Sequence, residues 1–440
     1  MSKNKVQPKI LPGFMELLPE DQIAFNKMYD TIRSVYERYG FLPLDTPLIE
    51  LSEVLLAKAG GETEKQIYRF QKGDNDLSLR FDLTVPLARY VAQHAGELAF
   101  PFKRYQMSKV FRGERPQKGR FREFYQCDID VIGQDSLDIV YDAEMPAVIY
   151  NVFKELAFGS FTIRMNNRKV LNGYFAELGY SEIIGDILRT IDKLEKIGRE
   201  AVTEELEKFG VKAEDAERIL AFLALRGAND DVIEALRAQN IENELYKQGV
   251  EELATVVSYL RLFGVEESAF IIDLTIARGL DYYTGTVFET MLNDYPSMGS
   301  VCSGGRYDSL AEYYTDQKLP GIGISIGLTR LFYQLKENGL IPAAGSGCVA
   351  RCLVIPMGEA QLGAALTAAS AIRGAGISAD VYCQSKGMKQ KMKYAAKIGV
   401  PYAAIIGEDE AAQGTVMLKD MATGEQKAVT VAELADAVRA

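Results

Sequence analysis

Histidine is nearly absent from this chain of 440 residues, which contains His94 and no other. Hydrolases with a serine or cysteine nucleophile usually place a histidine beside that nucleophile. His94 lies in residues 90–97, a helix-like stretch without a nucleophile motif nearby. Zinc motifs that use two histidines cannot be formed. The sequence therefore argues against triad hydrolases and against two-histidine zinc enzymes.

Cysteine and long apolar segments are also scarce. The five cysteines are odd in number and scattered along the chain, unlike a disulfide framework. Cys348 and Cys352 are one residue too far apart for a C-x-x-C zinc knuckle. No uncharged apolar run approaches the roughly 18 residues that cross a bilayer, and residues 1–14 lack the apolar core of a signal peptide. We expect reduced thiols, no structural metal, no membrane contact and a cytoplasmic location.

Positive charge is in the minority, because 50 basic residues face 61 acidic ones and leave a net charge of −11. Such a chain does not coat nucleic acid over its whole surface, although a local basic groove remains compatible with this balance. Apolar residues (48%) and charged residues (25%) have the proportions of a folded protein. The length predicts two or three domains.

Strand-like and helical patterns alternate over the first three quarters of the chain. Apolar residues recur with helical spacing in residues 21–39 and 83–94. Strand patterns occupy residues 41–51, 124–132, 161–165, 270–274, 287–292 and 322–326. The stretch 169–263 is almost continuously helical in pattern. We predict an α+β domain, residues 1–337, with an antiparallel sheet and a helical insertion at about 169–263.

The remaining residues have the pattern of a second domain. Residues 338–347 have the composition of a linker. After them, strands 352–356, 378–382 and 402–406 alternate with helices 361–373 and 389–398. This alternation predicts a small α/β domain, residues 348–440, with a largely parallel sheet.

The densest chemical signal is residues 103–122, where eight basic residues accompany a single acid, Glu114. Pro116 and Gly119 mark a loop between two strands, so the segment reads as a hairpin with a basic tip. Arg112 lies at a strand end, and its planar guanidinium suits a phosphate. A solvated charged loop is the alternative. The spacing of Gly321, Gly323 and Gly327 does not match a dinucleotide fingerprint, so we interpret them as packing glycines.

Residues 111–124, FRGERPQKGRFREF, closely resemble motif 2 of the class II histidyl-tRNA synthetases. Other family elements follow in the expected order. Residues 46–47 suit motif 1, 80–89 resemble an amino-acid-binding segment, 276–289 and 303–308 the two histidine-binding segments, 327–331 motif 3, and 386–395 the anticodon-binding domain. The resemblance implies the class II synthetase fold: an antiparallel-sheet catalytic domain with a helical insertion, followed by a C-terminal α/β anticodon-binding domain. It also implies a homodimer, because motif 1 lies at the dimer interface of these enzymes.

The implied reaction joins L-histidine to tRNA(His) in two steps. The histidine carboxylate attacks the α-phosphate of ATP, and the histidyl group then moves to the terminal ribose of the tRNA. By resemblance, Arg112 and Arg278 are the catalytic residues at the α-phosphate, Glu114 contacts adenine and Arg330 holds the distal phosphates. We expect Mg²⁺ with the ATP phosphates, but the sequence does not identify its ligands. Thr329 replaces the glutamate common in motif 3, which weakens the prediction for Arg330.

A site that selects histidine needs polar partners for both ring nitrogens, and Asp130 with Tyr283 offers a carboxylate and a phenol. Leaving such groups unpaired penalises a wrong amino acid heavily. Each carboxylate, taken alone, is equally explained as the partner of an arginine. The resemblance adds further histidine contacts: Asp82, Thr84, Gln126, Tyr282 and Tyr307.

Binding of tRNA is expected at two places. The motif 2 residues Arg115 and Gln117 form one of them. In the last domain, Lys389, Lys393 and Lys397 follow each other at helical spacing, with Lys386 just before them. Such a ridge can contact RNA phosphates, although a merely solvated lysine face is the alternative.

The sequence is also compatible with two other functions. The chain can be a synthetase-like regulatory subunit, such as that of ATP phosphoribosyltransferase, which resembles only the catalytic domain. It can also be a paralogue that senses histidine or tRNA without charging activity. The segment 386–440 argues against the first alternative.

Overall fold

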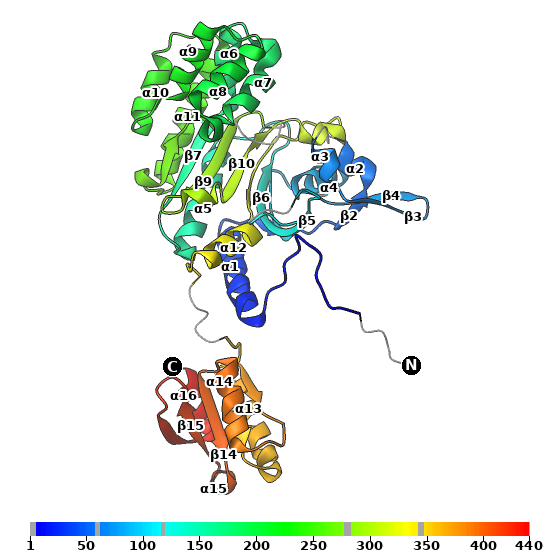
Figure 1. Ribbon diagram of the computed structural model, residues 1–440, viewed down its shortest axis with the longest axis vertical. Coiled ribbons are helices and arrows are strands. Elements are labelled where there is room, and N and C mark those ends of the chain that lie inside the picture. Colours follow the sequence, from blue (N-terminus) through cyan, green and yellow to red (C-terminus); the bar gives the residue numbers. More distant parts are fainter. Residues whose placement is uncertain (1–5, 58–61, 116–118, 277–282, 342–346, 440) are drawn as a thin grey trace. The chain divides into compact units, whose positions relative to one another are not determined.

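The computed structural model describes residues 6–57, 62–115, 119–276, 283–341 and 347–439. The chain divides into two compact units (Figure 1). One unit comprises residues 1–15 and 29–340, and the other comprises residues 16–28 and 341–440. Our limits of 1–337 and 348–440, with a linker at 338–347, remain a prediction.

An eight-stranded sheet forms the centre of the first unit, with the strand order β1-β5-β6-β11-β10-β9-β7-β8. Its strands are β1 Leu42–Pro43, β5 Phe102–Phe111, β6 Glu123–Ile132, β7 Phe161–Asn167, β8 Phe270–Ile272, β9 Thr286–Leu292, β10 Cys302–Tyr307 and β11 Gly321–Ile326. All neighbours from β5 to β7 are antiparallel, and only β1 and β8 pair in parallel. The predicted α+β class with an antiparallel sheet is confirmed.

The predicted helical insertion is present between β7 and β8, in the green part of Figure 1. Its helices are α6 Arg168–Glu177, α7 Ile184–Ile191, α8 Leu194–Lys208, α9 Ala213–Leu223, α10 Asn229–Arg237 and α11 Glu244–Leu262. Helices α6 and α11 cross where both have a glycine. A Cβ on Gly173 would lie 2.5 Å from the backbone nitrogen of Tyr246, and one on Gly249 would lie 2.6 Å from that of Val170. The crossing therefore depends on two residues without side chains.

Other helices cover the sheet or flank it: α1 Pro19–Arg38, α2 Ser52–Leu56, α3 Glu62–Gln66, α4 Thr84–His94, α5 Val140–Leu156 and α12 Leu328–Glu337. Short 3₁₀ helices occupy Ser181–Ile183, Glu267–Ala269, Pro296–Met298, Leu310–Tyr313 and Glu359–Gln361. Tyr36 of α1 donates a hydrogen bond to the carbonyl of Cys127 on β6 (2.9 Å), and Tyr29 packs edge-on against Tyr125. Helix α1 therefore covers one face of β6, and the opposite face is left for a site.

The predicted single strand over residues 41–51 is wrong. The structure has β1 in the large sheet and β2 Ile49–Leu51 in a separate sheet of order β2-β4-β3, with β3 Arg69–Lys72 and β4 Asn75–Leu79. Pro43 and Pro47 have no N–H to donate, so a continuous ladder cannot run through them. Helix α5 and strand β10 were not predicted at all.

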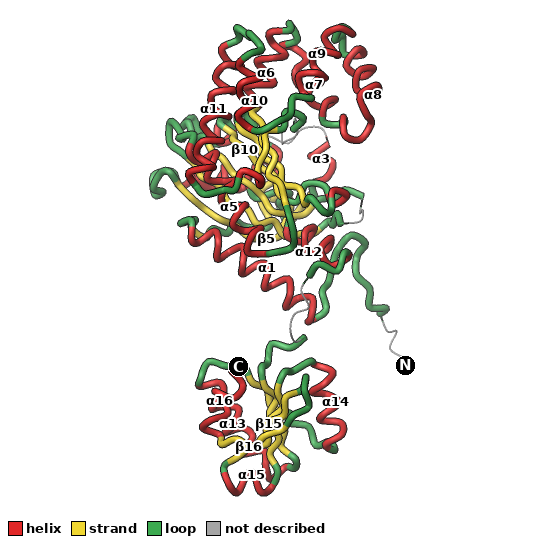
Figure 2. The backbone as a smooth tube through the Cα atoms, turned by 90° about the vertical axis from the view of Figure 1, so that its left-hand side faces the viewer, coloured by secondary structure: helices red, strands yellow, loops and turns green. Residues whose placement is uncertain are grey.

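The second unit contains a five-stranded sheet of order β13-β12-β14-β15-β16. Its elements are β12 Cys352–Pro356, α13 Leu362–Gly374, β13 Ala379–Val381, α14 Met388–Ile398, β14 Tyr402–Ile406, α15 Glu408–Gln413, β15 Thr415–Asp420, β16 Gln426–Thr430 and α16 Val431–Arg439. The three predicted strands are parallel, and an antiparallel hairpin, β15–β16, extends them. Figure 2 shows helices on both sides of this sheet. No helix of the described chain is long and apolar enough to cross a membrane.

Candidate active site

A cavity of about 620 Å³ opens on the face of β6 that α1 does not cover. Side chains alternate between the two faces of a strand, so every second residue of β6 points into the cavity. These residues are Phe124, Gln126, Asp128 and Asp130. The hairpin of β5 and β6, predicted from the basic segment, therefore forms one wall of the site.

Glycines on the neighbouring strands β10 and β11 leave space for the side chains that line the cavity. A Cβ on Gly323 of β11 would lie 2.0 Å from Oδ1 of Asp130, and one on Gly321 would lie 2.4 Å from the ring of Tyr307. A Cβ on Gly304 of β10 would lie 2.1 Å from the backbone oxygen of Gly323. The interpretation of Gly321 and Gly323 as packing glycines agrees with these contacts. It is wrong for Gly327, because a Cβ there would lie 3.9 Å from its nearest atom, the Cβ of Arg330.

Most of the residues predicted for the site line this cavity. They are Asp82, Thr84, Arg112, Glu114, Gln126, Asp130, Tyr283, Tyr307 and Arg330. Arg278, Tyr282 and Gln117 lie outside the described residues. Arg115 is described but does not line the cavity, and the predicted lysines belong to the second unit.

Asp130 lies at the buried end of the cavity with both carboxylate oxygens engaged. Tyr307 donates a hydrogen bond to Oδ1 (2.6 Å), and the guanidinium of Arg104 lies 2.6 Å from Oδ2. Burial raises the pKa of Asp130, while Arg104 and Tyr307 oppose the shift. Burial raises the pKa of Tyr307 well above its usual value, so its phenol stays a neutral donor. The arginine partner of Asp130 is therefore Arg104 and not Arg112.

Two further buried carboxylates share this end. Burial raises the pKa of Asp82 to about 6, although a backbone hydrogen bond from Val85 and the charge of Arg112 oppose the rise. Burial raises the pKa of Asp128 to about 7, opposed by Arg104 and increased by the nearby charge of Asp130. Three acids thus lie close to one fully buried arginine, and this end of the cavity attracts cations.

The motif arginines Arg112 and Arg330 line the same cavity and are less buried than Asp130. Arg112 donates from Nε to the carbonyl of Phe81 (3.0 Å) and lies over the ring of Phe124, with 5.2 Å between the guanidinium carbon and the ring centre. Arg330 donates to the carbonyl of Met298 (2.7 Å). Glu114 lies 3.7 Å from Arg120. These contacts hold the arginines on the cavity wall, where they suit an anionic ligand.

Comparison with known proteins agrees with this geometry. A family model described as histidyl-tRNA synthetase matches residues 13–331, and one described as an anticodon binding domain matches residues 351–440. The chain belongs to the histidyl-tRNA synthetase family.

Individual members of the family match over the full length. A histidine–tRNA ligase of Clostridium tetani is 57% identical over 433 residues, which cover 98% of each chain. The crystal structure of a histidyl-tRNA synthetase from Nostoc sp. PCC 7120 superposes with a TM-score of 0.92 at 42% identity, covering 99% of each chain.

A more distant structure has a mixed description. It is an ATP phosphoribosyltransferase regulatory subunit/histidyl-tRNA synthetase from Bacillus halodurans, with a TM-score of 0.74 at 22% identity over 88% of this chain and 97% of its own. At that identity the likeness shows a shared fold alone.

Thr329, which stands where the family commonly has a glutamate, has a structural role in this chain. Its hydroxyl accepts a hydrogen bond from the backbone N–H of Tyr125 (2.8 Å), which ties the start of α12 to β6. Arg330 nevertheless lines the cavity, since the carbonyl of Met298 holds it there. The departure from the family pattern does not remove Arg330 from the site.

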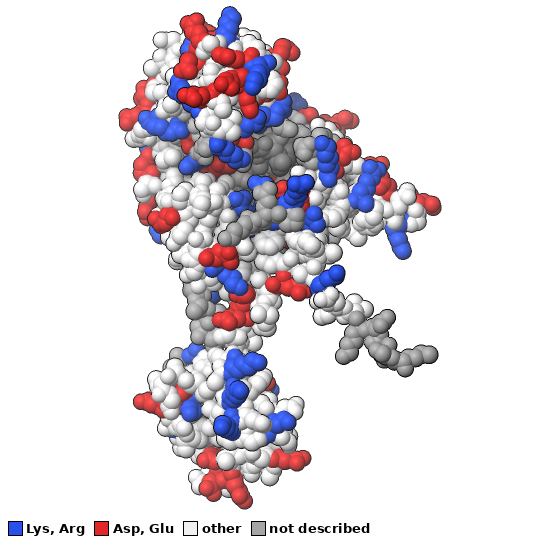
Figure 3. All heavy atoms as spheres, viewed as in Figure 1, with Lys and Arg blue, Asp and Glu red and all other residues white. Residues whose placement is uncertain are grey.

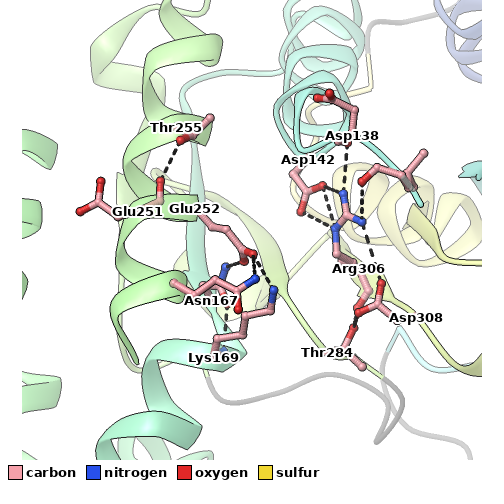
Figure 4. Close-up of polar contacts among 12 residues, drawn as sticks. Asp138, Asp142, Asn167, Lys169, Glu251, Glu252, Thr255, Thr284, Arg306 and Asp308 are labelled. Carbon is pink, nitrogen blue, oxygen red and sulfur yellow. Dashed lines mark hydrogen bonds and ion pairs between the residues drawn. The ribbon is translucent and has the colours of Figure 1, made fainter. Parts of the chain in front are cut away.

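A buried arginine outside the cavity supports the histidine-binding segments (Figure 4). Arg306 binds the carboxylate of Asp142 at 3.0 and 3.2 Å through Nε, and also donates to the backbone carbonyl of Asp138 (3.2 Å). In the same view, the hydroxyl of Thr284 pairs with Asp308. The backbone N–H of Thr284 donates to the carbonyl of Arg306 (2.8 Å). These contacts anchor the chain immediately after Tyr283.

The sequence did not predict three features of the site: Asp128 in the cavity wall, Arg104 as the partner of Asp130, and the Arg306–Asp142 pair. Asp128 could have been found, because it alternates with Gln126 and Asp130 on one strand face. The two arginine contacts join residues 26 and 164 positions apart in the chain. No pattern in the neighbouring sequence predicts such pairs.

Replacement of Asp82 by Asn should stabilise the protein in the absence of ligands at about pH 8. The folded protein binds the Asp82 proton more tightly than the unfolded chain does, so the parent loses stability as the pH rises from about 4 to about 6. Asn removes this loss, and we expect a gain of at most about 2–3 kcal/mol at about pH 8 that vanishes toward about pH 4.

Urea unfolding of both proteins across this pH range measures the difference. Exposed Asp316, outside the cavity lining, is the matched control for the same replacement. A pH-independent difference for Asp82→Asn would contradict the raised pKa of Asp82.

Proposed function

We propose a division of roles among the cavity residues for the reaction of a histidine–tRNA ligase, the activity that the full-length matches assign to this chain. The observation that supports it is that one cavity holds groups of both charges. Buried acids lie around Asp130, in what we call the acidic end, and the less buried Arg112 and Arg330 form what we call the basic end. Histidine carries a cationic ammonium group and ATP is a polyanion, so each end fits one substrate.

At the acidic end, Asp130 and Tyr283 bind the two nitrogens of the imidazole ring. Tyr307 and Arg104 hold the Asp130 carboxylate in place, and each of its oxygens keeps a second lone pair for the ring. Asp82 and Thr84 bind the α-ammonium group, with Gln126 beside them. We also assign Tyr282 to the histidine by its place in the motif.

At the basic end, Arg112 holds the α-phosphate and the substrate carboxylate, Arg330 the distal phosphates and Glu114 the adenine. Arg278 supplies a second positive charge at the α-phosphate. The histidine carboxylate oxygen attacks phosphorus while the bond to pyrophosphate breaks. Because a carboxylate is already the nucleophile, the step needs alignment and charge stabilisation rather than a base.

Mg²⁺ fits this site as a companion of the ATP phosphates. The described residues contain no cluster of three metal-ligating side chains, and Mg²⁺ commonly takes one or two carboxylates plus substrate phosphates. Glu289 of β9 lines the cavity and fits that pattern. When bound, the ion would neutralise charge that develops on the leaving pyrophosphate.

For tRNA binding we propose the exposed lysines beside and on α14: Lys386, Lys389 and Lys393. Figure 3 shows Lys and Arg atoms gathered in a run on the visible face of this unit. Lys391 on the same helix is different, because it is buried and donates to the carbonyl of Pro356 (2.5 Å). Arg115 and Gln117 of motif 2 contact the acceptor end. A cytoplasmic location remains a prediction from the sequence.

We also propose a homodimer. Exposed apolar side chains gather around β1 and the three-stranded sheet: Leu42, Leu48, Ile49, Leu51 and Phe70. Two of them, Leu42 and Leu48, lie on either side of the motif 1 residues Thr46 and Pro47 in the chain. A second copy of the chain would cover this patch, since soluble monomers seldom leave such patches exposed.

Light scattering tests the dimer. We expect twice the chain mass of 48.8 kDa and a shift to the monomer for Leu48→Glu/Ile49→Glu. Leu262→Glu, at a residue that is 80% exposed on α11, is the matched control and should stay dimeric. A parent protein that is monomeric throughout the concentration range would refute the proposal.

Arg278→Ala should reduce histidine-dependent ATP–pyrophosphate exchange by roughly 10²–10³-fold, because one charge at the developing transition state is lost. The parent must show exchange and charge tRNA(His), which also separates a ligase from an idle paralogue. Activity of the variant within a few-fold of the parent would assign Arg278 to the structure instead of to the reaction.

Lys389→Ala/Lys393→Ala should weaken tRNA binding and leave pyrophosphate exchange unchanged, because the two steps use different surfaces. Each phosphate contact contributes about 0.7–0.9 to the slope of log affinity against log salt, so the slope should fall by about 1.5. The control is Lys419→Ala/Lys427→Ala on the β15–β16 hairpin. Equal effects of the two double variants would argue against a specific ridge on α14.

A further inference from the structure

Four buried acceptor atoms of cavity-lining side chains have no hydrogen-bond partner among the described residues, and one of them, Oδ2 of Asp130, is ion-paired with Arg104 (2.6 Å). The other three are Oδ2 of Asp82, Oε1 of Gln126 and Oδ1 of Asp128. All three side chains line the cavity and are at least nine-tenths buried, with exposed fractions of 3%, 9% and 3%. Buried acceptors are normally paired, so three unpaired ones in a single cavity indicate a missing donor.

Each acceptor is held in place by contacts of its other atoms. Nε2 of Gln126 donates to the hydroxyl of Ser325 (2.7 Å), which leaves Oε1 as the free end of the amide. Ser325 lies opposite Asp128 in the register of β6 and β11 and bonds to its carboxylate. Oδ1 of Asp82 accepts from the N–H of Val85 (3.1 Å). The free oxygens are therefore fixed in position before any ligand arrives.

A cation with several N–H groups suits these acceptors, because two of the three belong to carboxylates. The buried guanidinium of Arg104 lies 2.6 Å from the carboxylate of Asp130, and its Nε and Nη1 make no hydrogen bond to any described residue, so they do not supply the missing donor. A primary ammonium group has three N–H donors, one for each unpaired oxygen. A metal ion fits less well, since the described residues contain no group of three metal-ligating side chains.

We infer that Asp128 is a specificity-determining residue that accepts a hydrogen bond from the α-ammonium group of histidine, together with Asp82 and Gln126. The inference rests on the proposed function, which places histidine at this end of the cavity, with Asp82 and Thr84 on its ammonium group and Gln126 beside them. Asp128 is the new member of the set. It makes recognition of the amino group depend on two carboxylates instead of one.

A purely structural role for Asp128 is the competing explanation. Gln106 of β5 lies opposite Asp128 in the strand register, and its Oε1 is also buried without a partner among the described residues. A protonated Asp128 could serve that oxygen. An amide would serve it equally well, so Asp128→Asn separates the two roles.

The test measures three dissociation constants by calorimetry for the parent and for Asp128→Asn. The ligands are L-histidine, histidinol, which keeps the ammonium group but lacks the carboxylate, and imidazole propionate, which keeps the ring and the carboxylate but lacks the amino group. We expect roughly a ten- to hundred-fold loss for the first two ligands and little change for the third.

Asp130→Asn is the matched control, because it makes the same chemical change two residues along the same strand face. It should weaken all three ligands, since every one of them contains the ring. Ser325→Ala is a second variant that removes the group bonded to Asp128 and Gln126, and it should weaken the two ammonium ligands selectively but by a smaller factor. This variant keeps the test decisive if Asp128→Asn does not fold.

Failure of the inference and failure of the proposed function give different results. If the parent does not bind histidine and shows no exchange, the proposed function is wrong. If the parent binds histidine but Asp128→Asn weakens all three ligands equally, or none of them, Asp128 does not recognise the ammonium group.

Discussion

The active site depends on one buried contact, the ion pair of Arg104 with Asp130. Four neighbouring strands meet there. Arg104 comes from β5, Asp130 from β6, the space beside Asp130 from Gly323 of β11, and the phenol that completes its hydrogen bonding from Tyr307 of β10. Removing one partner of a buried pair leaves an uncompensated charge and typically costs about 3–5 kcal/mol. The order and register of the central strands are therefore fixed by the same contact that prepares the floor of the site.

One arginine does not neutralise three acids, and this imbalance distinguishes a binding site from a structural core. Asp82 and Asp128 hold pKa values near 6 and 7 because burial penalises their charge. The empty protein is destabilised by that penalty at neutral pH, and a cationic substrate removes it. Natural proteins often give up stability at functional sites in this way. In the roles we propose for them, the two carboxylates convert a cost in folding into affinity for the ammonium group.

Much of this structure could be predicted from the sequence, where local signals are strong. The insertion is visible in its helical periodicity, the β5–β6 hairpin in its alternation and turn residues, and most cavity residues in family motifs. Strand β10 was missed because residues 302–307, CSGGRY, lack alternating apolar residues and are glycine-rich for contact with the neighbouring strands. The partners Arg104 and Asp142 could not be predicted, since the strand register and the packing of α5 bring them into place.

Thr329 replaces a glutamate that is common in the family, and the site keeps its arrangement without that charge. A glutamate there would place a negative charge beside Arg330 and offset part of its field at the ATP phosphates. Threonine keeps the attachment of α12 to β6 through an uncharged hydrogen bond to the N–H of Tyr125. Arg330 donates to the carbonyl of Met298 and lines the cavity. The start of α12 is thus attached to the sheet by a hydrogen bond between neutral groups, at the position where the family's glutamate would add a charge.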